Sequence, residues 1–373
     1  MTEAMEDFSD QPEIPWRRVR RLPYIPDAPH VQPIFGFDSS LQQWTEIETH
    51  HHFHQPRSDD TTNTATTVTN TTIIDKIALF SWNIDFSLPH PRSRMRAALA
   101  ELQARIAGLP ADTAVVIFLQ ECEAVDIETI GETGWVRTGF LRTDVDAFYW
   151  PGSYGTTTLV DRRLRVAGVF RVHFAMTDMD RDGLFVDVLW DSKSRDSGWE
   201  LVSRYNDGVD GDGGKEEEEG KVMRFCNTHL ESLAQESAFR PSQMALIAKF
   251  MHEESVHGAL LAGDLNAIQP FDRTLHSANG LRDAYLDLGG QEDTDEGYTW
   301  GQQAAPTARE RYGCCRMDKV LYCGGVSVQR FGRFGADVEV DDSDERARIM
   351  RSGDFEKAWI TDHLGVFAEI VLN

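Results

Sequence analysis

The fold is decided by the stretch Ala259-Leu260-Leu261-Ala262-Gly263-Asp264-Leu265-Asn266. Its apolar half has the composition of a buried strand, and its polar half places a carboxylate and an amide at the strand's end. Three more strings share this plan, namely Ser81-Trp82-Asn83-Ile84-Asp85, Leu119-Gln120-Glu121 and Thr361-Asp362-His363. Because strand ends can converge on one site, the four strings predict a single polar centre in an α/β or α+β domain.

These residue types suit the metal-assisted hydrolysis of a phosphodiester. That reaction needs a hard cation held by oxygen ligands, an activated water, and donors for the charge that develops on the phosphoryl group. Glu121 suits the cation, and Asp264 with Asn266 suits the water. His363 can act as an imidazolium beside the developing charge if a carboxylate raises its pKa. Two carboxylates are candidates for that partner, Asp318 and Asp362.

Each string also has a purely structural interpretation. Asn83 can satisfy buried backbone groups, Asp264-Leu265-Asn266 can form an Asx-turn, and Asp362-His363 can cap a helix. Glu121 resists such an interpretation, because an unpaired carboxylate after an apolar run is costly to bury. The joint occurrence of the strings favours catalysis.

The order of the strings resembles the endonuclease/exonuclease/phosphatase superfamily from about residue 74 to the end of the chain. Six strings carry the resemblance: Trp82-Asn83, Leu119-Gln120-Glu121, His229-Leu230-Glu231-Ser232, Gly263-Asp264-Leu265-Asn266, Arg316-Met317-Asp318 and Asp362-His363. Three strings resemble the type-2 tyrosyl-DNA phosphodiesterases in particular: Trp82-Asn83-Ile84-Asp85, Thr228-His229-Leu230-Glu231-Ser232 and Tyr298-Thr299-Trp300. The resemblance implies a DNase I-like fold, which is a four-layer α/β sandwich of two mixed β-sheets flanked by helices.

The resemblance also implies how the metal and the nucleophile are held. Glu121 would bind Mg²⁺, which Mn²⁺ could replace, and Asp362 would help to hold the metal's water shell. Asn83 would lie beside the metal and the phosphate. Asp264 and Asn266 would position the nucleophile and stabilise the transition state.

Further residues would meet the substrate. By the same resemblance, His229 and His363 would contact the scissile phosphate, and Asp318 would orient His363. Trp300 would lie near bound DNA, where an exposed indole can stack on a base. Tyr154 would lie near the phosphate from its loop.

The chain departs from the tyrosyl-DNA enzymes directly after Asn266. In those enzymes the string continues into Leu-Arg-Asp, whose arginine serves the substrate side of the site, whereas here Ala267-Ile268-Gln269-Pro270-Phe271 follows. The departure concerns the leaving group and does not touch the phosphodiesterase core. Arg240 and Gln243 share one expected helix face and are expected to brace the His229 loop.

We therefore expect a metal-dependent phosphoric diester hydrolase that acts on DNA ends and hydrolyses 5′-phosphotyrosyl bonds in DNA repair. The alternative is an enzyme of the same superfamily acting on RNA, a nucleotide cofactor or a small phosphoester. A non-catalytic binding protein on this fold is disfavoured, because the site residues are all present. The net charge of −24 opposes a long nucleic-acid footprint, although residues 206–220 alone carry seven acids against one lysine.

Composition divides the chain into two regions. Residues 1–73 are expected to be a largely disordered tail and linker, because Ser58 to Thr72 consists almost wholly of Thr, Asp, Asn and Ala. An exception is Pro33 to Trp44, whose aromatic residues could dock on the core as a strap. Residues 74–373 are expected to form the catalytic domain. The basic patch Arg17 to Arg21 suits a nuclear address, a nucleic-acid arm or a solvated charge run.

The expected protein is monomeric and intracellular, in the nucleus or the cytoplasm. No apolar run approaches the ~20 residues that span a bilayer, and an odd number of cysteines, five in all, suits free thiols in a reducing compartment. Periodicity predicts strands at 76–83, 114–120, 222–229, 258–263, 317–323 and 363–371, β-rich segments from 146 to 190 and at 199–202, and helices near 92–108, 124–131 and 239–254.

Overall fold

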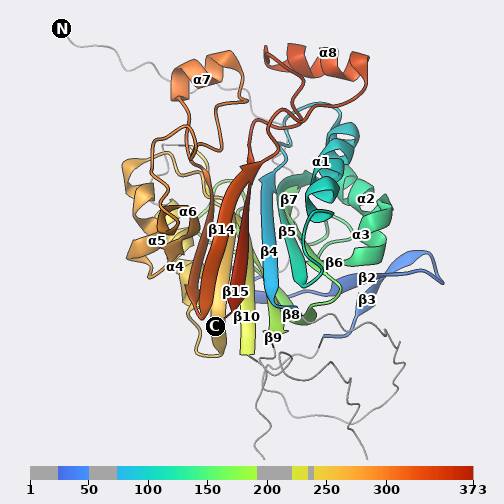
Figure 1. The fold of residues 1–373 in the computed structure, drawn as a ribbon, viewed down its shortest axis with the longest axis vertical. Coiled ribbons are helices and arrows are strands. Elements are labelled where there is room, and N and C mark those ends of the chain that lie inside the picture. Colours follow the sequence, from blue (N-terminus) through green and yellow to red (C-terminus); the bar gives the residue numbers. More distant parts are fainter. Residues whose placement is uncertain (1–23, 50–73, 191–220, 234–238, 373) are drawn as a thin grey trace, which may run out of the picture.

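The computed structural model describes residues 24–49, 74–190, 221–233 and 239–372. Within these ranges two mixed β-sheets pack face to face, and helices cover their outer faces (Figure 1). The predicted four-layer α/β sandwich is thereby confirmed. Among the described residues, no helix has the length and apolar character needed to cross a membrane.

The strands form one sheet of seven and one of eight described members. In neighbour order, the first sheet holds β1 (Pro29–Val31), β8 (Arg165–His173), β9 (Asp182–Trp190), β10 (Lys221–His229), β11 (Val256–Asp264), β13 (Asp318–Gly324) and β12 (Arg282–Asp283). The second holds β14 (Val326–Phe334), β15 (Gly365–Leu372), β4 (Lys76–Asn83), β5 (Thr113–Glu123), β7 (Tyr154–Asp161), β6 (Phe140–Arg142), β2 (Ile34–Asp38) and β3 (Gln43–Ile47). Each sheet has one parallel pair, β10 with β11 and β4 with β5.

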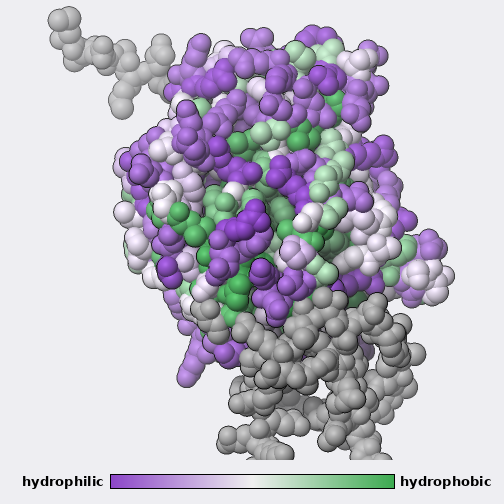
Figure 2. All heavy atoms as spheres, in the orientation of Figure 1, coloured by the Kyte–Doolittle hydropathy of each residue, from purple (hydrophilic) through white to green (hydrophobic). Residues whose placement is uncertain are grey.

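The helices lie outside the sheets. Their bounds are α1 (Pro91–Ile106), α2 (Ala124–Glu132), α3 (Gly134–Gly139), α4 (Phe239–Met251), α5 (Leu275–Ala278), α6 (Ala284–Asp287), α7 (Pro306–Tyr312) and α8 (Ser343–Ser352). Figure 1 shows α1 to α3 on one side of the sandwich, α4 to α6 on the other, and α7 and α8 together at one end. The surface over α7 and α8 is mainly hydrophilic, whereas hydrophobic residues are visible over the strands in the middle of the same face (Figure 2).

Three apolar clusters follow from this layering. Strand β4 shows how one sequence serves two of them, because successive side chains of a strand point to opposite faces. Ile77 and Leu79 enter the cluster between the sheets, whereas Phe80 and Trp82 pack under α1 and α2. A third cluster lies between the first sheet and α4. A strand that is buried on both faces has a nearly continuous run of apolar residues, and such runs predicted these strands from the sequence.

The predicted elements of the core are present with small shifts of their ends. The elements that the sequence did not indicate include the short helix α7, the polar helix α8 and the partly exposed edge strand β14. In α8 the buried residue is Ile349, so no apolar stripe marks this helix. The expected strand at 199–202, the acidic segment 206–220 and the basic patch Arg17 to Arg21 lie outside the described residues.

Residues 24–49 require a correction to the expected domain boundary at residue 74. Strand β1 pairs with β8 in the first sheet, and β2 pairs with β6 in the second. Ile34 is fully buried between the sheets, and the Trp44 indole donates to the carbonyl of Gly131 at 3.1 Å. This segment, which includes the suspected strap, therefore belongs to the folded domain, because its alternating apolar residues complete the core.

We predict that Ile34→Ala lowers the free energy of unfolding by about 2–5 kcal/mol, the range for truncating a fully buried isoleucine. Urea denaturation monitored by tryptophan fluorescence would measure the change. Ile25→Ala is the matched control, since this isoleucine is 71% exposed and its truncation should change stability by less than about 0.5 kcal/mol. Equal effects of the two substitutions would contradict the docking of β2.

Candidate active site

The carboxyl ends of the two parallel pairs meet across the sandwich. Asn83 ends β4, Glu121 lies near the end of β5, and His229 and Asp264 end β10 and β11. The Asn83 side-chain amide donates to Glu121 Oε1 at 3.1 Å and to Asp264 Oδ2 at 3.0 Å. One amide thus links a carboxylate of each sheet, and the predicted convergence of strand ends is observed.

Glu121 projects from an irregularity in β5. The pairing of β5 with β7 shifts register between Leu119 and Cys122, and Glu121 adopts a left-handed backbone conformation with φ of 57°. Such a conformation is uncommon for residues other than glycine and persists where the surroundings enforce it. The bulge turns the carboxylate toward the site, where Oε2 accepts from the backbone N–H of Phe86 at 3.0 Å.

His229 and Asp264 are direct neighbours in the parallel register of β10 and β11. His229 Nε2 lies 3.3 Å from Asp264 Oδ2 and 3.7 Å from Glu121 Oε1. The two strands approach closely just before Asp264, because a Cβ on Gly263 would lie 1.8 Å from the carbonyl oxygen of Thr228. Glycine is therefore required ahead of Asp264.

Asp264 uses its two carboxylate oxygens differently. Oδ1 accepts from the backbone N–H of Asn266 at 2.8 Å, which is an Asx-turn, while Oδ2 faces the site. Asn266 has a left-handed φ of 47°, and its amide donates to the carbonyl of Leu230 at 3.0 Å. The structural and the functional interpretations of this string therefore both hold, since the turn aims the free oxygen.

His363 completes the cluster from the segment before β15. Its Nδ1 lies 2.8 Å from Asp318 Oδ2, whereas Nε2 is 3.8 Å from Asp362 Oδ1 and 3.7 Å from Asp264 Oδ2. Of the two candidate partners, Asp318 is therefore the one that hydrogen-bonds the ring. Asp362 instead accepts from the Trp300 indole at 2.6 Å.

Burial and neighbouring charges set the protonation of His363 and of the carboxylates around it. Burial alone would lower the pKa of His363, but the surrounding carboxylates raise that pKa well above its ordinary value; they belong to Asp318, Asp264 and Asp362. Burial raises the pKa of Asp318 to about 6, against the opposing charge of His363. Burial also acts to raise the pKa of Asp264, yet the two histidines outweigh it and hold that pKa below its usual range. The site therefore pairs an imidazolium with an ionised Asp264.

The two aromatic residues expected to meet the substrate lie at the border of the cluster. Tyr154 stacks on Phe86, with ring centroids 4.0 Å apart, and Phe86 in turn donates to Glu121. Trp300 is half-buried and reaches the cluster through Asp362. All ten residues that the sequence singled out for the site are thus brought into one connected region.

Sequence reasoning missed two residues of this region. Arg181 donates from Nη1 to His229 Nδ1 at 2.8 Å and lies 5.5 Å from the Tyr154 ring centroid. Asp85 is buried, and burial, followed by the charges of Asp362 and Glu121, raises its pKa to about 7. Asp85 stands inside a quoted string and could have been found there, whereas Arg181 follows no motif and had no signal.

The expected brace around His229 is observed. Gln243 Oε1 accepts from the backbone N–H of Glu231 at 2.9 Å. Arg240 is fully buried, donates to the carbonyl of Glu231, and forms two hydrogen bonds with Asp272. Asp272 Oδ2 also accepts from the backbone N–H groups of Ile268 and Gln269. The segment that departs from the tyrosyl-DNA pattern is thereby tied to the His229 loop.

The donor set fits a divalent cation. One atom each of Glu121, His229 and Asp264 lies within 4.8 Å of the others. Because Arg181 donates to His229 Nδ1, Nε2 carries the ring proton, and the carboxylates of Glu121 and Asp264 are the groups that would face the cation. Burial and then the charges of Asp362 and Glu121 raise the pKa of Asp85, and a cation would relieve the repulsion among these carboxylates. Glu121 would hold the cation, which supplies a Lewis acid and lowers the pKa of a bound water.

The fold and the site together define a metal-dependent phosphodiesterase. The chain belongs to the Endonuclease/Exonuclease/phosphatase family, whose model matches residues 80–363. No curated protein sequence matches the chain.

Solved structures support the fold. Truncated TDP2 of Caenorhabditis elegans superposes with a TM-score of 0.55 at 17% identity, over 79% of this chain and 97% of that chain. D. rerio TDP2 complexed with single strand DNA product gives a TM-score of 0.53 at 17% identity, over 79% of this chain and 98% of that chain. The human Nocturnin catalytic domain with bound sulfate anion gives 0.50 at 14% identity, over 81% and 98%. At these identities the likeness establishes the fold.

We predict that Glu121→Gln reduces the rate of hydrolysis of bis(p-nitrophenyl) phosphate at least about a hundredfold. The loss of the carboxylate charge would weaken binding of the cation that stabilises the transition state. Release of p-nitrophenol, followed in excess Mg²⁺ and after chelation, would measure the effect. Glu123→Gln is the matched control, since that side chain caps α2. Undiminished turnover in excess chelator would refute the metal mechanism.

Proposed function

We propose that this protein is a magnesium-dependent phosphodiesterase that acts on DNA ends and hydrolyses 5′-phosphotyrosyl bonds in DNA repair. One observation carries the proposal. The three strings that resemble the tyrosyl-DNA enzymes contribute Asn83, His229 and Trp300. Asn83 and His229 both contact Asp264, and Trp300 donates to Asp362 at the same centre. Strings far apart in the chain would not converge in this way if each served only local structure.

Asp264 is the proposed acceptor of the proton from the attacking water. It is ionised, its Oδ2 faces the site, and the Asn83 amide fixes its direction. Asn266 holds the turn that aims this oxygen. With Glu121 holding Mg²⁺, and Asp362 its water shell, the attacking water and the phosphorus would be brought within reach of each other.

His363 is the proposed stabiliser of the charge on the phosphoryl oxygens. Asp318 accepts from Nδ1 and leaves the Nε2–H side of the ring directed to the centre. His229 supplies a second nitrogen from the opposite sheet, and its Nε2 is free of hydrogen bonds to described residues. Two fixed donors around the phosphate stabilise the transition state without reorganisation of water.

The leaving group would meet Tyr154 and Arg181. The family's arginine is absent after Asn266, but the Arg181 guanidinium lies over the Tyr154 ring and beside His229. A cation next to an aromatic ring suits a phenolate that departs from phosphorus. This arrangement offers a tyrosyl substrate a positive charge that the sequence comparison did not find.

The alternative substrates are RNA, a nucleotide cofactor and a small phosphoester. The net charge of −24 and the segment Ala267 to Phe271 favour them over a long DNA duplex. Contact confined to a short single-stranded end reconciles this charge with the proposed DNA substrate. A non-catalytic protein is disfavoured by the hydrogen-bonded order of the whole centre.

We predict that Asp318→Asn lowers kcat by about 10²–10⁴-fold, the range seen when a carboxylate that orients a catalytic histidine is neutralised. Steady-state kinetics on a 5′-tyrosyl oligonucleotide would measure the loss. The double variant Asp318→Asn/His363→Ala should lose no more activity than His363→Ala, because the pair acts as one unit. Additive losses in the double variant would contradict the pairing.

We predict that Ile268→Arg raises the ratio of turnover on a 5′-tyrosyl oligonucleotide to that on an untagged one by about ten- to a hundredfold, the value of a charge-assisted donor. Ile268→Met is the neutral control. Parallel assays on an abasic duplex, an RNA oligomer and a dinucleotide cofactor would rank the alternatives. Turnover of the cofactor without turnover of any DNA end would refute the proposed substrate.

A further inference from the structure

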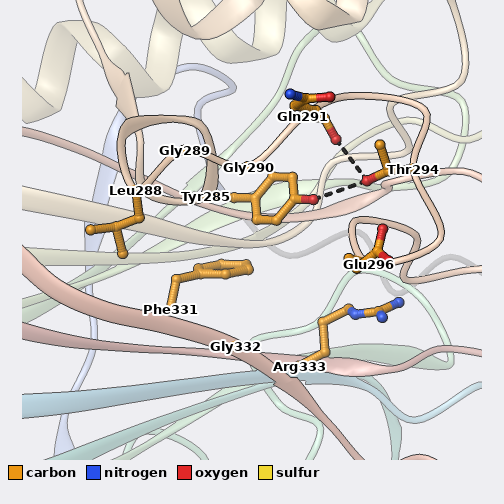
Figure 3. A pocket seen from close by; sticks show the side chains of 10 residues that line it. All are labelled: Tyr285, Leu288, Gly289, Gly290, Gln291, Thr294, Glu296, Phe331, Gly332 and Arg333. Atoms are coloured by element: carbon orange, nitrogen blue, oxygen red, sulfur yellow. Dashed lines mark hydrogen bonds between the residues drawn. The ribbon is translucent and has the colours of Figure 1, made fainter.

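A cavity of about 470 Å³ lies outside the catalytic cluster, between the segment that follows α6 and the edge strand β14. Its volume falls within the range of small-molecule sites. Figure 3 shows residues of both walls, with the Tyr285 ring near the centre and Phe331 and Arg333 projecting from β14. None of the motifs of the catalytic centre contributes a residue to this cavity.

The cavity has aromatic walls that are held in place. The rings of Tyr285 and Phe331 lie 5.5 Å apart at 53° and form a corner. A Cβ on Gly290 would lie 2.5 Å from the Tyr285 ring, so the backbone of the loop rests on that ring. The Tyr285 hydroxyl forms a hydrogen bond of 3.1 Å with the Thr294 hydroxyl. That Thr294 hydroxyl donates in turn to the carbonyl of Gln291 (Figure 3). The loop is thereby pinned, and the cavity is preformed.

The polar groups of the cavity select a neutral ligand with both donors and acceptors. Arg333 and Glu296 contribute opposite charges, so the lining as a whole has no excess of either sign. A ligand with a net charge would be repelled by whichever of these two side chains has the same sign, and its desolvation would not be compensated. Gln291, which is exposed, adds an amide to the lining, and the partly exposed Phe331 adds an aromatic ring on the other side of Tyr285 (Figure 3). A flat aromatic face with donors and acceptors at its border matches the way proteins bind unstacked nucleobases.

We propose that this cavity is a nucleobase-binding site, with Phe331 as the stacking partner and Gln291 and Arg333 at the edge of the base. The base could come from the substrate strand or from a free nucleoside, and both present the same chemistry. A base of the strand would extend the proposed function, on which that source of the ligand rests.

The cavity is joined to the catalytic centre through Arg333. Its Nη1 donates to the carbonyl of Tyr298 and to Gln302 Oε1. Tyr298 is two residues from Trp300, which is at most about 7 Å along the chain. Thr299, between them, accepts from the backbone N–H of Asp318. A base in the cavity would therefore be linked, through Arg333, to the segment that supports both Trp300 and the partner of His363.

The test measures binding directly. Adenosine is titrated into the Glu121→Gln protein by calorimetry, and a fluorescent single-stranded DNA hexamer and dimer are titrated by anisotropy. Phe331→Leu keeps an apolar side chain and removes the aromatic face. Phe148→Leu is the control, because this phenylalanine is 52% exposed and precedes β7, toward the opposite edge of the same sheet. Thermal unfolding of both variants establishes that they are folded.

The expected result is that Phe331→Leu weakens adenosine binding about tenfold or more, as for loss of a stacking partner, while Phe148→Leu has no effect. If Phe331→Leu weakens binding of the DNA hexamer by the same factor as binding of adenosine, and leaves binding of the DNA dimer unchanged, the site belongs to the substrate strand. Weakening for adenosine alone assigns it to a free nucleoside. If Phe331→Leu changes neither titration, the proposal is overturned. Because no turnover is measured, this outcome is independent of whether the protein cleaves tyrosyl-DNA.

Discussion

The Asn83 side chain donates to carboxylates of both sheets, and the active site depends on that link. Glu121 belongs to one sheet and Asp264 to the other, so neither sheet alone contains the centre. The amide lies between two groups that would otherwise repel each other in a buried region, and it fixes the gap between the sheets at their carboxyl edge. The remaining catalytic groups are arranged around this link.

The buried ionisable groups of the active site differ in the direction in which their pKa values are shifted. His363 is held as a cation among carboxylates, Asp264 is held ionised, and burial raises the pKa of Asp85 and Asp318. Such separation of protonation states within one cluster is what acid–base chemistry on a phosphate requires. The cost of burying these charges is offset by mutual pairing, and the pairs that brace the loops, such as Arg240 with Asp272, extend this arrangement away from the centre.

The substrate side is less conventional than the core. The Arg181 guanidinium contacts His229 from the residue that precedes β9. After Asn266, the backbone N–H groups of Ile268 and Gln269 donate to Asp272, and Ala267 to Phe271 includes no arginine. The cavity beside β14 adds an aromatic surface linked to Trp300 through Arg333. These features lie on loops and beside an edge strand, where the sequence can vary without disturbing the sheets.

The sequence by itself determined the buried strands, the polar residues at their ends and the family, because continuous apolar runs and short ordered strings are local signals. It also indicated Glu121, Asp264 and His363 correctly as neighbours. The resemblance also implied that Asp318 orients His363, and the hydrogen bond between them agrees. Tertiary structure alone decided the recruitment of Arg181 and the inclusion of residues 24–49 in the domain. Each of these rests on contacts between segments far apart in the chain, and a local pattern does not say which distant segment a strand or side chain will meet.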